Sequence, residues 1–126
     1  MALKYELKTK HNGIESQEKK KYYPVLTGRM VANTERVSEY IGKRTSLSAT
    51  DVEAVISALA DAIPEFLEDN YNVKLDKLGT FSVHATSKGR EDPTQITSRD
   101  ITGLKMSFLP SKRMKRQLTN FKVVKS

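Results

Sequence analysis

Four basic residues near the C-terminus are the side chains in this sequence best suited to binding chemistry. They directly follow a Pro-Ser pair that is typical of a helix start: Lys112, Arg113, Lys115 and Arg116. Cations in the first turn of a helix oppose its macrodipole, so helix stability does not explain their presence. Contact with an external anion, such as a nucleic-acid phosphate, does explain it. A solvated basic face and a localisation signal are the alternatives.

The neighbouring elements must position these cations. Residues 104–108 alternate between apolar and polar types, which predicts a strand facing the core, and Pro110 ends that strand. Ser111 is the expected N-cap of a last helix over residues 112–120. The inner positions of this helix are Met114, Leu118 and Phe121.

Residues with catalytic or metal-binding chemistry are sparse. The two histidines, His11 and His84, are far apart and have no neighbouring acidic cluster, and the chain has no cysteine. No paired-carboxylate motif, nucleophile elbow or Walker loop is present. We therefore expect no enzymatic activity, no metal site and no cofactor.

A long amphipathic helix is predicted in the middle of the chain, and the other elements are organised around it. Ser48 is its expected N-cap, with Asp51 completing a capping box, and Asn70 is the expected left-handed residue after it. Pro64 removes one backbone hydrogen bond and is expected to kink the helix near Ala60. The apolar face repeats at helical spacing over about four turns: Val52, Val55, Ile56, Leu59, Ile63, Phe66 and Leu67.

Shorter elements flank this helix. A first helix, capped by Asn33 or Thr34 and ending near Lys43, precedes it and makes a helical hairpin with it. Its expected inward residues are Val37, Tyr40 and Ile41. After the long helix, alternating residues on either side of a turn at Lys77–Gly79 predict a two-stranded unit. The apolar residues of that unit are Val73, Leu75, Phe81 and Val83.

The span from Thr86 to Gly103 is polar and rich in turn residues, with apolar support only from Ile96 and Ile101. A structureless loop of this length is unusual in a compact domain, so we expect a protruding β-ribbon. Its three basic residues are balanced by three acidic ones: Lys88, Arg90 and Arg99 against Glu91, Asp92 and Asp100. A neutral ribbon gains little from counterion release.

Residues 1–30 form a separate, strand-rich N-terminal extension in this interpretation, and residues 31–126 form the main domain. Strict alternation over Leu3–Lys8 predicts a half-buried strand, and Tyr22–Leu26 predicts a second strand that Pro24 limits to a sheet edge. His11-Asn12-Gly13 is a turn signal, and Glu15–Lys21 is an expected exposed connection. Two such strands need support from the main domain or from a partner.

Composition and charge set further bounds. The 126 residues allow one modest domain, and a hydrophobic content of 37% favours burial in an oligomer. The net charge of +7 is segregated: residues 47–80 carry two bases and seven acids, whereas residues 81–126 carry ten bases and three acids. Such segregation favours a polyanionic partner. No membrane-spanning run or secretory signal is evident, so a cytoplasmic protein is the default expectation.

The order of these parts resembles the HU/IHF family of histone-like DNA-binding proteins. The resemblance covers about residues 33–121 and rests on four motifs. They are Leu47-Ser48-Ala49-Thr50-Asp51, Val73-Lys74-Leu75 with Leu78-Gly79-Thr80-Phe81, Lys88-Gly89-Arg90 with Pro93, and Phe108-Leu109-Pro110-Ser111. The extension with its Tyr22-Tyr23 pair is similar to the extended HU-like branch of Bacteroides-type bacteria.

The resemblance implies an α+β fold and an intertwined homodimer, with a helical hairpin, an antiparallel sheet, a protruding β-arm and a C-terminal helix. In this family, two arms embrace the DNA minor groove and a proline at each tip wedges between base pairs. Pro93 is the matching position. Here the tip reads Arg90-Glu91-Asp92-Pro93-Thr94-Gln95, so two carboxylates lie beside the proline.

The sequence therefore predicts a non-enzymatic, nucleoid-associated bacterial protein that binds, condenses or bends double-stranded DNA as a homodimer, with little sequence specificity. The alternative is an HU-fold structural module with reduced DNA binding, whose N-terminal extension binds another protein. RNA binding is a third option, disfavoured because no aromatic stacking platform is evident. The candidate DNA-binding residues are Lys88, Arg90, Pro93, Arg99, Lys112, Arg113, Lys115 and Arg116. We expect the last helix to supply most of the contacts to DNA, with help from N-terminal lysines.

Overall fold

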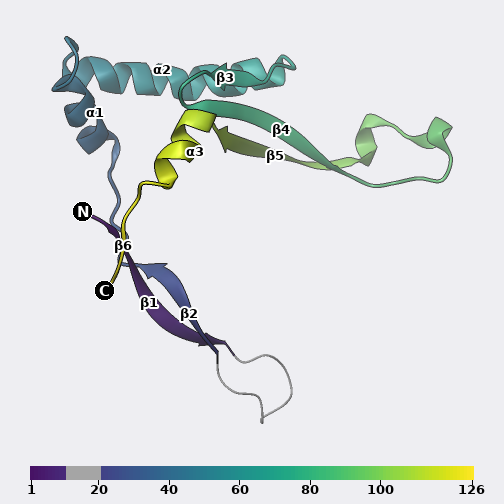
Figure 1. The fold of residues 1–126 in the computed structure, drawn as a ribbon. Coiled ribbons are helices and arrows are strands. Elements are labelled where there is room, and N and C mark those ends of the chain that lie inside the picture. Colours follow the sequence, from purple (N-terminus) through teal and green to yellow (C-terminus); the bar gives the residue numbers. More distant parts are fainter. Residues whose placement is uncertain (11–20) are drawn as a thin grey trace.

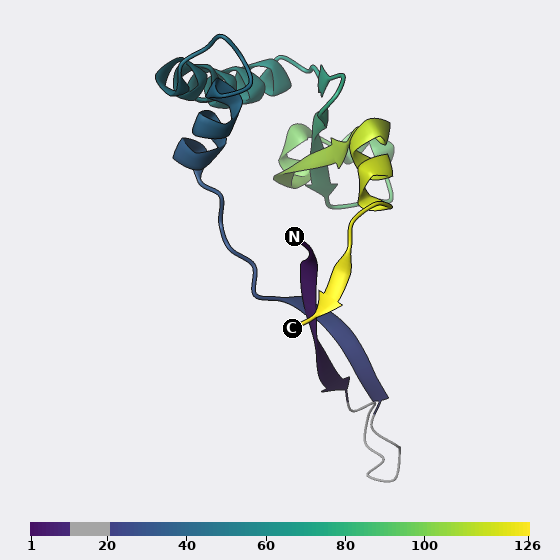
Figure 2. The ribbon, with the colours of Figure 1, turned by 60° about the vertical axis from the view of Figure 1, so that its left-hand side comes forward.

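The computed structural model describes residues 1–10 and 21–126. Within them the chain is α+β, with three α-helices and two separate three-stranded sheets (Figure 1). A helical hairpin lies at one end of the molecule, one sheet lies beside it, and the second sheet lies apart, close to both chain termini (Figures 1 and 2).

The helical hairpin is formed by α1 (Thr34–Gly42) and α2 (Ala49–Glu68). Asn33, not Thr34, caps α1, with its Oδ1 accepting a hydrogen bond from the Arg36 backbone N–H at 2.9 Å. Ser48 caps α2 in the same way. Only this half of the expected capping box is found among the described hydrogen bonds, since Asp51 takes part through its backbone N–H alone.

The C-terminal half of α2 bears on two further expectations. The helix continues past Pro64 to Glu68 as the single α-helix that was predicted, although proline removes one backbone hydrogen bond. The kink expected near Ala60 stays a prediction. Asn70 follows the helix with φ 69°, the left-handed conformation that ends many helices. The Tyr71 backbone N–H then bonds to the Phe66 carbonyl oxygen, which satisfies one of the last free acceptors.

The described chain buries few apolar side chains. Val52, Ile63 and Leu67, all on α2, are its buried hydrophobic residues. Other residues on the predicted apolar face of α2 are open, with Val55 59% and Phe66 53% exposed. The predicted inward stripe of α1 is likewise mostly exposed at Val37 and Tyr40, and the α1 residue that is buried is Ser38. A single chain therefore presents an apolar helical surface that it does not itself cover.

The sheet beside the helices has the order β3-β4-β5, with antiparallel neighbours. Its strands are β3 (Val73–Leu75), β4 (Gly79–Ser87) and β5 (Ile101–Pro110). Gly79 opens β4 with φ 154°, and a Cβ atom there would collide with the Leu109 carbonyl oxygen and the Phe108 ring. Only glycine fits at this point. Phe108 packs instead against Phe81, with ring centroids 4.7 Å apart.

The expected β-ribbon over Thr86–Gly103 is found only at its base. The ladder between β4 and β5 ends with the pairs Thr86–Gly103 and Ser87–Ile101. Residues 88–100 form a loop with two short 3₁₀ turns, η1 (Pro93–Gln95) and η2 (Ser98–Asp100), and we call this segment the β4–β5 loop. The ribbon prediction was wrong there because a proline and side-chain caps favour local turns over cross-strand pairing.

The second sheet combines the N-terminal extension with the last strand, in the order β2-β1-β6. Its strands are β1 (Leu3–Lys10), β2 (Lys21–Thr27) and β6 (Val123–Lys125). β2 lies at an edge, as Pro24 predicted. β6 was not predicted; it runs parallel to β1 and pairs Leu3 with Val123.

Two sequence-based expectations fall on residues outside the described part. These are the turn at His11-Asn12-Gly13 and the connection Glu15–Lys21, except for Lys21, which begins β2. The division of the chain at residue 30 stays a prediction.

Candidate nucleic-acid interface

The last helix, α3 (Lys112–Leu118), is held at the base of the β4–β5 hairpin by its cap residue. The Ser111 Oγ accepts a hydrogen bond from the Met114 backbone N–H at 3.2 Å and donates one to the Lys77 carbonyl oxygen at 2.8 Å. The Ser111 backbone N–H also donates to the carbonyl oxygen of Leu78. These contacts fix the start of α3 on the turn between β3 and β4.

The four predicted phosphate ligands are all exposed on α3, and we call them the α3 cations: Lys112, Arg113, Lys115 and Arg116. Within residues 1–10 and 21–126, none of them forms an ion pair. The Arg116 Nε reaches the carbonyl oxygen of Lys112 at 3.4 Å, which is a weak contact. Four positive charges are thus available to an external anion.

The helix is shorter than predicted, because it ends at Leu118 and not at Asn120. Its length decides which of the α3 cations lie at the end where the helix dipole disfavours positive charge. Lys115 and Arg116 lie in its last turn, where cations interact favourably with the helix dipole. The argument that cations oppose the dipole therefore applies to Lys112 and Arg113 alone.

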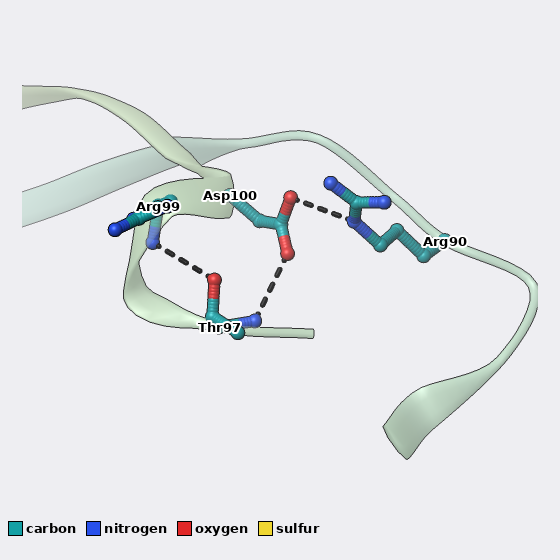
Figure 3. A network of polar contacts seen from close by, with 4 residues as sticks. All are labelled: Arg90, Thr97, Arg99 and Asp100. Atoms are coloured by element: carbon teal, nitrogen blue, oxygen red, sulfur yellow. Dashed lines mark hydrogen bonds and ion pairs between the residues drawn. The ribbon is translucent and has the colours of Figure 1, made fainter. Parts of the chain in front are cut away.

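The β4–β5 loop holds the other candidate residues and is organised around a buried carboxylate (Figure 3). Asp100 is 4% exposed. Its Oδ1 accepts a hydrogen bond from the Arg90 Nε at 2.9 Å, and its Oδ2 accepts one from the Thr97 backbone N–H at 3.0 Å. The Thr97 Oγ1 accepts a bond from the Arg99 backbone N–H, and Thr97 and Asp100 together form the capping box of η2. Arg90 is therefore neutralised by an ion pair, unlike the α3 cations.

A second acidic residue of the loop, Asp92, caps η1, which begins at Pro93. Its Oδ1 accepts hydrogen bonds from both the backbone N–H and the Oγ1 of Thr94, at 3.0 and 2.8 Å. These bonds, with the side-chain bond as the larger cause, hold the pKa of Asp92 below its ordinary value. Asp92 therefore keeps a negative charge next to the proline.

Two of the predicted loop ligands are exposed cations, and neither forms an ion pair among the described residues: Lys88 and Arg99. The Lys88 backbone N–H donates to the Asp100 carbonyl oxygen at 2.7 Å, so the start of the loop is closed against its end. Side chains of both residues are free to turn toward solvent. Glu91 and Asp92 are also exposed, so once Arg90 and Asp100 are set aside as a pair, the loop surface carries two cations and two carboxylates.

The structure does not bring the two groups of candidate residues together. The hairpin pairs Gly79 with Pro110 at the end where α3 begins, and Ser87 with Ile101 at the end where the loop begins. Eight residues of extended strand separate these ends by about 27 Å. That length corresponds to about eight base pairs of duplex DNA.

Sequence reasoning missed the role of Asp100, which it counted only as one of the charges that balance the loop. A signal was present: Thr97 and Asp100 have the spacing of a capping box, in which a hydroxyl and a carboxylate three residues apart bond each other's backbone N–H groups. Such a pattern predicts a turn with a fixed carboxylate. Figure 3 shows that fixed carboxylate meeting Arg90 from the opposite side of the loop.

Comparison with known proteins gives the family. The family model described as an HU domain fused to wHTH, Ig, or glycine-rich motif matches residues 1–125. The chain belongs to this HU-HIG family. The match includes the N-terminal extension and β6, so both are parts of the HU-HIG pattern.

A solved structure is also similar to this HU-HIG chain. It is a candidate bacterial DNA-binding protein from Bacteroides vulgatus ATCC 8482, with a TM-score of 0.68 and 11% sequence identity. The likeness covers 98% of this chain and 47% of that one, so this chain spans about half of that protein's length. At this identity the likeness concerns the fold. No match was found among the curated proteins.

Two further observations bear on the kind of site. Within the described ranges there is no group of three or more His, Cys, Asp or Glu side chains placed to hold a metal ion. None of the described helices has the length and apolar character that crossing a bilayer requires.

Proposed function

We propose that this HU-HIG protein binds double-stranded DNA as a homodimer with little sequence specificity, and that the α3 cations supply most of the phosphate contacts. The observation that carries the proposal is the group of four exposed cations on α3, which have no carboxylate partner among the described residues. Lysine and arginine side chains in this state bind DNA by releasing condensed counterions. The role is architectural and not catalytic, in the nucleoid of a bacterium.

The homodimer rests on the small buried core. The three hydrophobic residues that are buried within residues 1–10 and 21–126 are too few to stabilise a domain of this size, while the apolar face of α2 stays open. A second copy that covers this face would supply the missing burial. It would also place two α3 helices and two β4–β5 loops on one duplex, and a homodimer of this kind fits the expected intertwined arrangement.

Bending by Pro93 is the finer part of the proposal. Pro93 is the first residue of η1 and lies between Asp92 and Thr94 at the far end of the hairpin. An apolar wedge is useful only if the bent duplex gains further contacts. The negative charge of Asp92 works against those contacts, so we assign a minor share of the affinity to this residue.

A protein-interaction module is the second candidate, and one observation favours it. The face of the β2-β1-β6 sheet carries an open apolar groove, lined by Tyr5, Leu7, Pro24, Leu26 and Val123. Such a groove suits a partner protein better than it suits DNA.

The sequence also predicts membership of the extended HU-like branch of Bacteroides-type bacteria. The likeness in fold to a Bacteroides vulgatus structure supports this part of the proposal.

A salt titration tests the function. The full chain is titrated with two duplexes of unrelated sequence over a range of salt concentrations, and its size is measured by sedimentation. We expect a dimer that binds both duplexes alike. Each phosphate contact contributes about −0.9 to the slope of log affinity against log salt concentration, so the four α3 cations of each of two copies give a slope near −7. Absence of binding at low salt would favour the protein-interaction module. A monomeric mass in sedimentation would contradict the proposed homodimer.

A further inference from the structure

The buried carboxylate of Asp100 is unusual for a loop at the end of a hairpin. Its side chain is 5% exposed, although the loop around it lies open to solvent. A buried carboxylate is unfavourable unless hydrogen bonds and a cation compensate it. Asp100 has both, from the Thr97 backbone N–H and from Arg90.

Arg90 is only partly used by this contact. Figure 3 shows its guanidinium joined to Asp100 through Nε alone, at 2.9 Å. The two terminal nitrogens make no hydrogen bond to any described residue, and the side chain is 46% exposed. A guanidinium has five N–H donors in a planar fork, so four remain for an acceptor outside the loop. That fork matches two phosphate oxygens.

We propose that Asp100 is a positioning residue, which holds Arg90 in the orientation that contacts a DNA phosphate. The proposal rests on the DNA binding inferred above. An arginine that is already ordered loses less rotamer freedom when it binds. The ion pair therefore prepares Arg90 for binding, and the loop contributes to affinity although its charges sum to zero.

Simple charge cancellation predicts the opposite. If Asp100 only neutralises Arg90, then removing its negative charge strengthens DNA binding, as it would at any other acidic residue of the loop. The variant Asp100→Asn separates the two cases. Its amide oxygen still accepts the Thr97 N–H, while its NH₂ group faces the Arg90 Nε, so two donors meet and Arg90 is released.

The experiment measures the dissociation constant of the full chain for a plain duplex at one salt concentration. Glu91→Gln is the matched control, because it makes the same charge change in the same loop at an exposed residue with no hydrogen bond described. We expect Asp100→Asn to weaken binding about fivefold and Glu91→Gln to strengthen it about twofold.

The same substitution in an Arg90→Ala background tests whether Asp100 acts through Arg90. Without the guanidinium there is nothing to position, so Asp100→Asn should then strengthen binding about twofold, as Glu91→Gln does. Strengthening in the wild-type background would show charge cancellation and overturn the proposal. Weakening in both backgrounds would show a general role in loop folding and would overturn it too.

Arg90→Lys tests the idea with Asp100 intact. Lysine keeps the charge and can pair with Asp100, but its single nitrogen leaves no fork for a phosphate. We expect binding about fivefold weaker, and unchanged binding would contradict the proposal. If the wild-type chain binds no duplex at low salt, the proposed function itself fails; if it binds and the Asp100 variants follow charge alone, only this inference fails.

Discussion

The α3 helix and the β4–β5 loop contain the same kinds of cation but differ in what surrounds them. The α3 cations are exposed and have no ion-pair partner among the described residues. The loop contains three cations and three carboxylates, and Asp100 engages Arg90 directly. A count of basic residues alone makes the two regions look similar. Their hydrogen bonds and ion pairs show the difference, since α3 presents unpaired positive charge and the loop is neutral and bonded within itself.

The two regions also differ in what maintains their shape. α3 is held through Ser111 and the backbone of the β3–β4 turn, so its charged side chains are not needed for its position. The β4–β5 loop is held by charged side chains, since Asp92 caps η1 and the Asp100 carboxylate completes the capping box that Thr97 begins at η2. Substitutions of the α3 cations should therefore report on binding alone, while some substitutions in the loop also change its structure.

The largest expected effect comes from replacing all four α3 cations with alanine. Alanine is a strong helix former and Ser111 is untouched, so the fold should be kept. Binding to every duplex should weaken by at least about a hundredfold at about 0.1 M salt, and the log–log slope should fall by about 0.9 for each phosphate that the helix no longer binds. Fluorescence anisotropy at several salt concentrations measures both quantities.

A control for net charge accompanies this variant. Replacing Arg36 and Lys43, at the two ends of α1, removes positive charge far from α3 in the sequence. This change should lower affinity only slightly. Equal reductions of affinity in the two variants would mean that overall charge, and not the α3 surface, holds the DNA.

Glu91→Lys should have a smaller effect of opposite sign. It converts the neutral loop into a positive one without removing a cap, because Glu91 has no hydrogen bond described in the loop. We expect about fivefold tighter binding and a steeper salt slope. Asp92→Lys should gain less, because it removes the two bonds from Thr94 that begin η1. Tighter binding by Asp92→Lys than by Glu91→Lys would contradict the capping role.

Pro93→Ala should have the smallest effect on affinity, within about twofold. The residue is exposed and starts a short turn that Asp92 still caps, and the neutral loop offers a bent duplex few new contacts. Affinity is measured as above, and bending by energy transfer between the ends of a labelled duplex. If Pro93→Ala abolishes both binding and bending, the loop is the principal DNA contact and the order of the two regions is reversed.

Elements with a strong local signal could be predicted from the sequence. The helical period and Ser48 indicated α2, the alternation of residues 104–108 indicated the centre of β5, and Ser111 indicated the start of α3. These signals are local because caps and periodicity depend on residues three or four positions apart.

Features that depend on distant residues could not be predicted. β6 is three residues long and exists through pairing with β1, which lies far away in the sequence. The burial of Asp100 depends on Arg90, which lies ten residues earlier across the loop. Val37 and Tyr40 are exposed because no other element of the described chain covers them. The helical spacing of apolar residues predicts that they share one face, but it does not say what packs against that face. The α3 cations were identified by residue type, and their role in binding stays a prediction.

The parallel pairing of β6 with β1 imposes an order on folding. Leu3 and Val123 are separated by 120 residues of sequence, so the third strand of this sheet leaves the ribosome long after the first two. The entropic cost of closing so long a loop is only about 2 kcal/mol above that of a loop of about 12 residues, since it grows with the logarithm of length. The late pairing of β6 therefore affects the timing of folding more than the stability of the sheet. During synthesis, β1 has one unpaired edge for the whole time that the helices and the other sheet are being made. A newly made chain must keep that edge from pairing with other strands until its own β6 arrives.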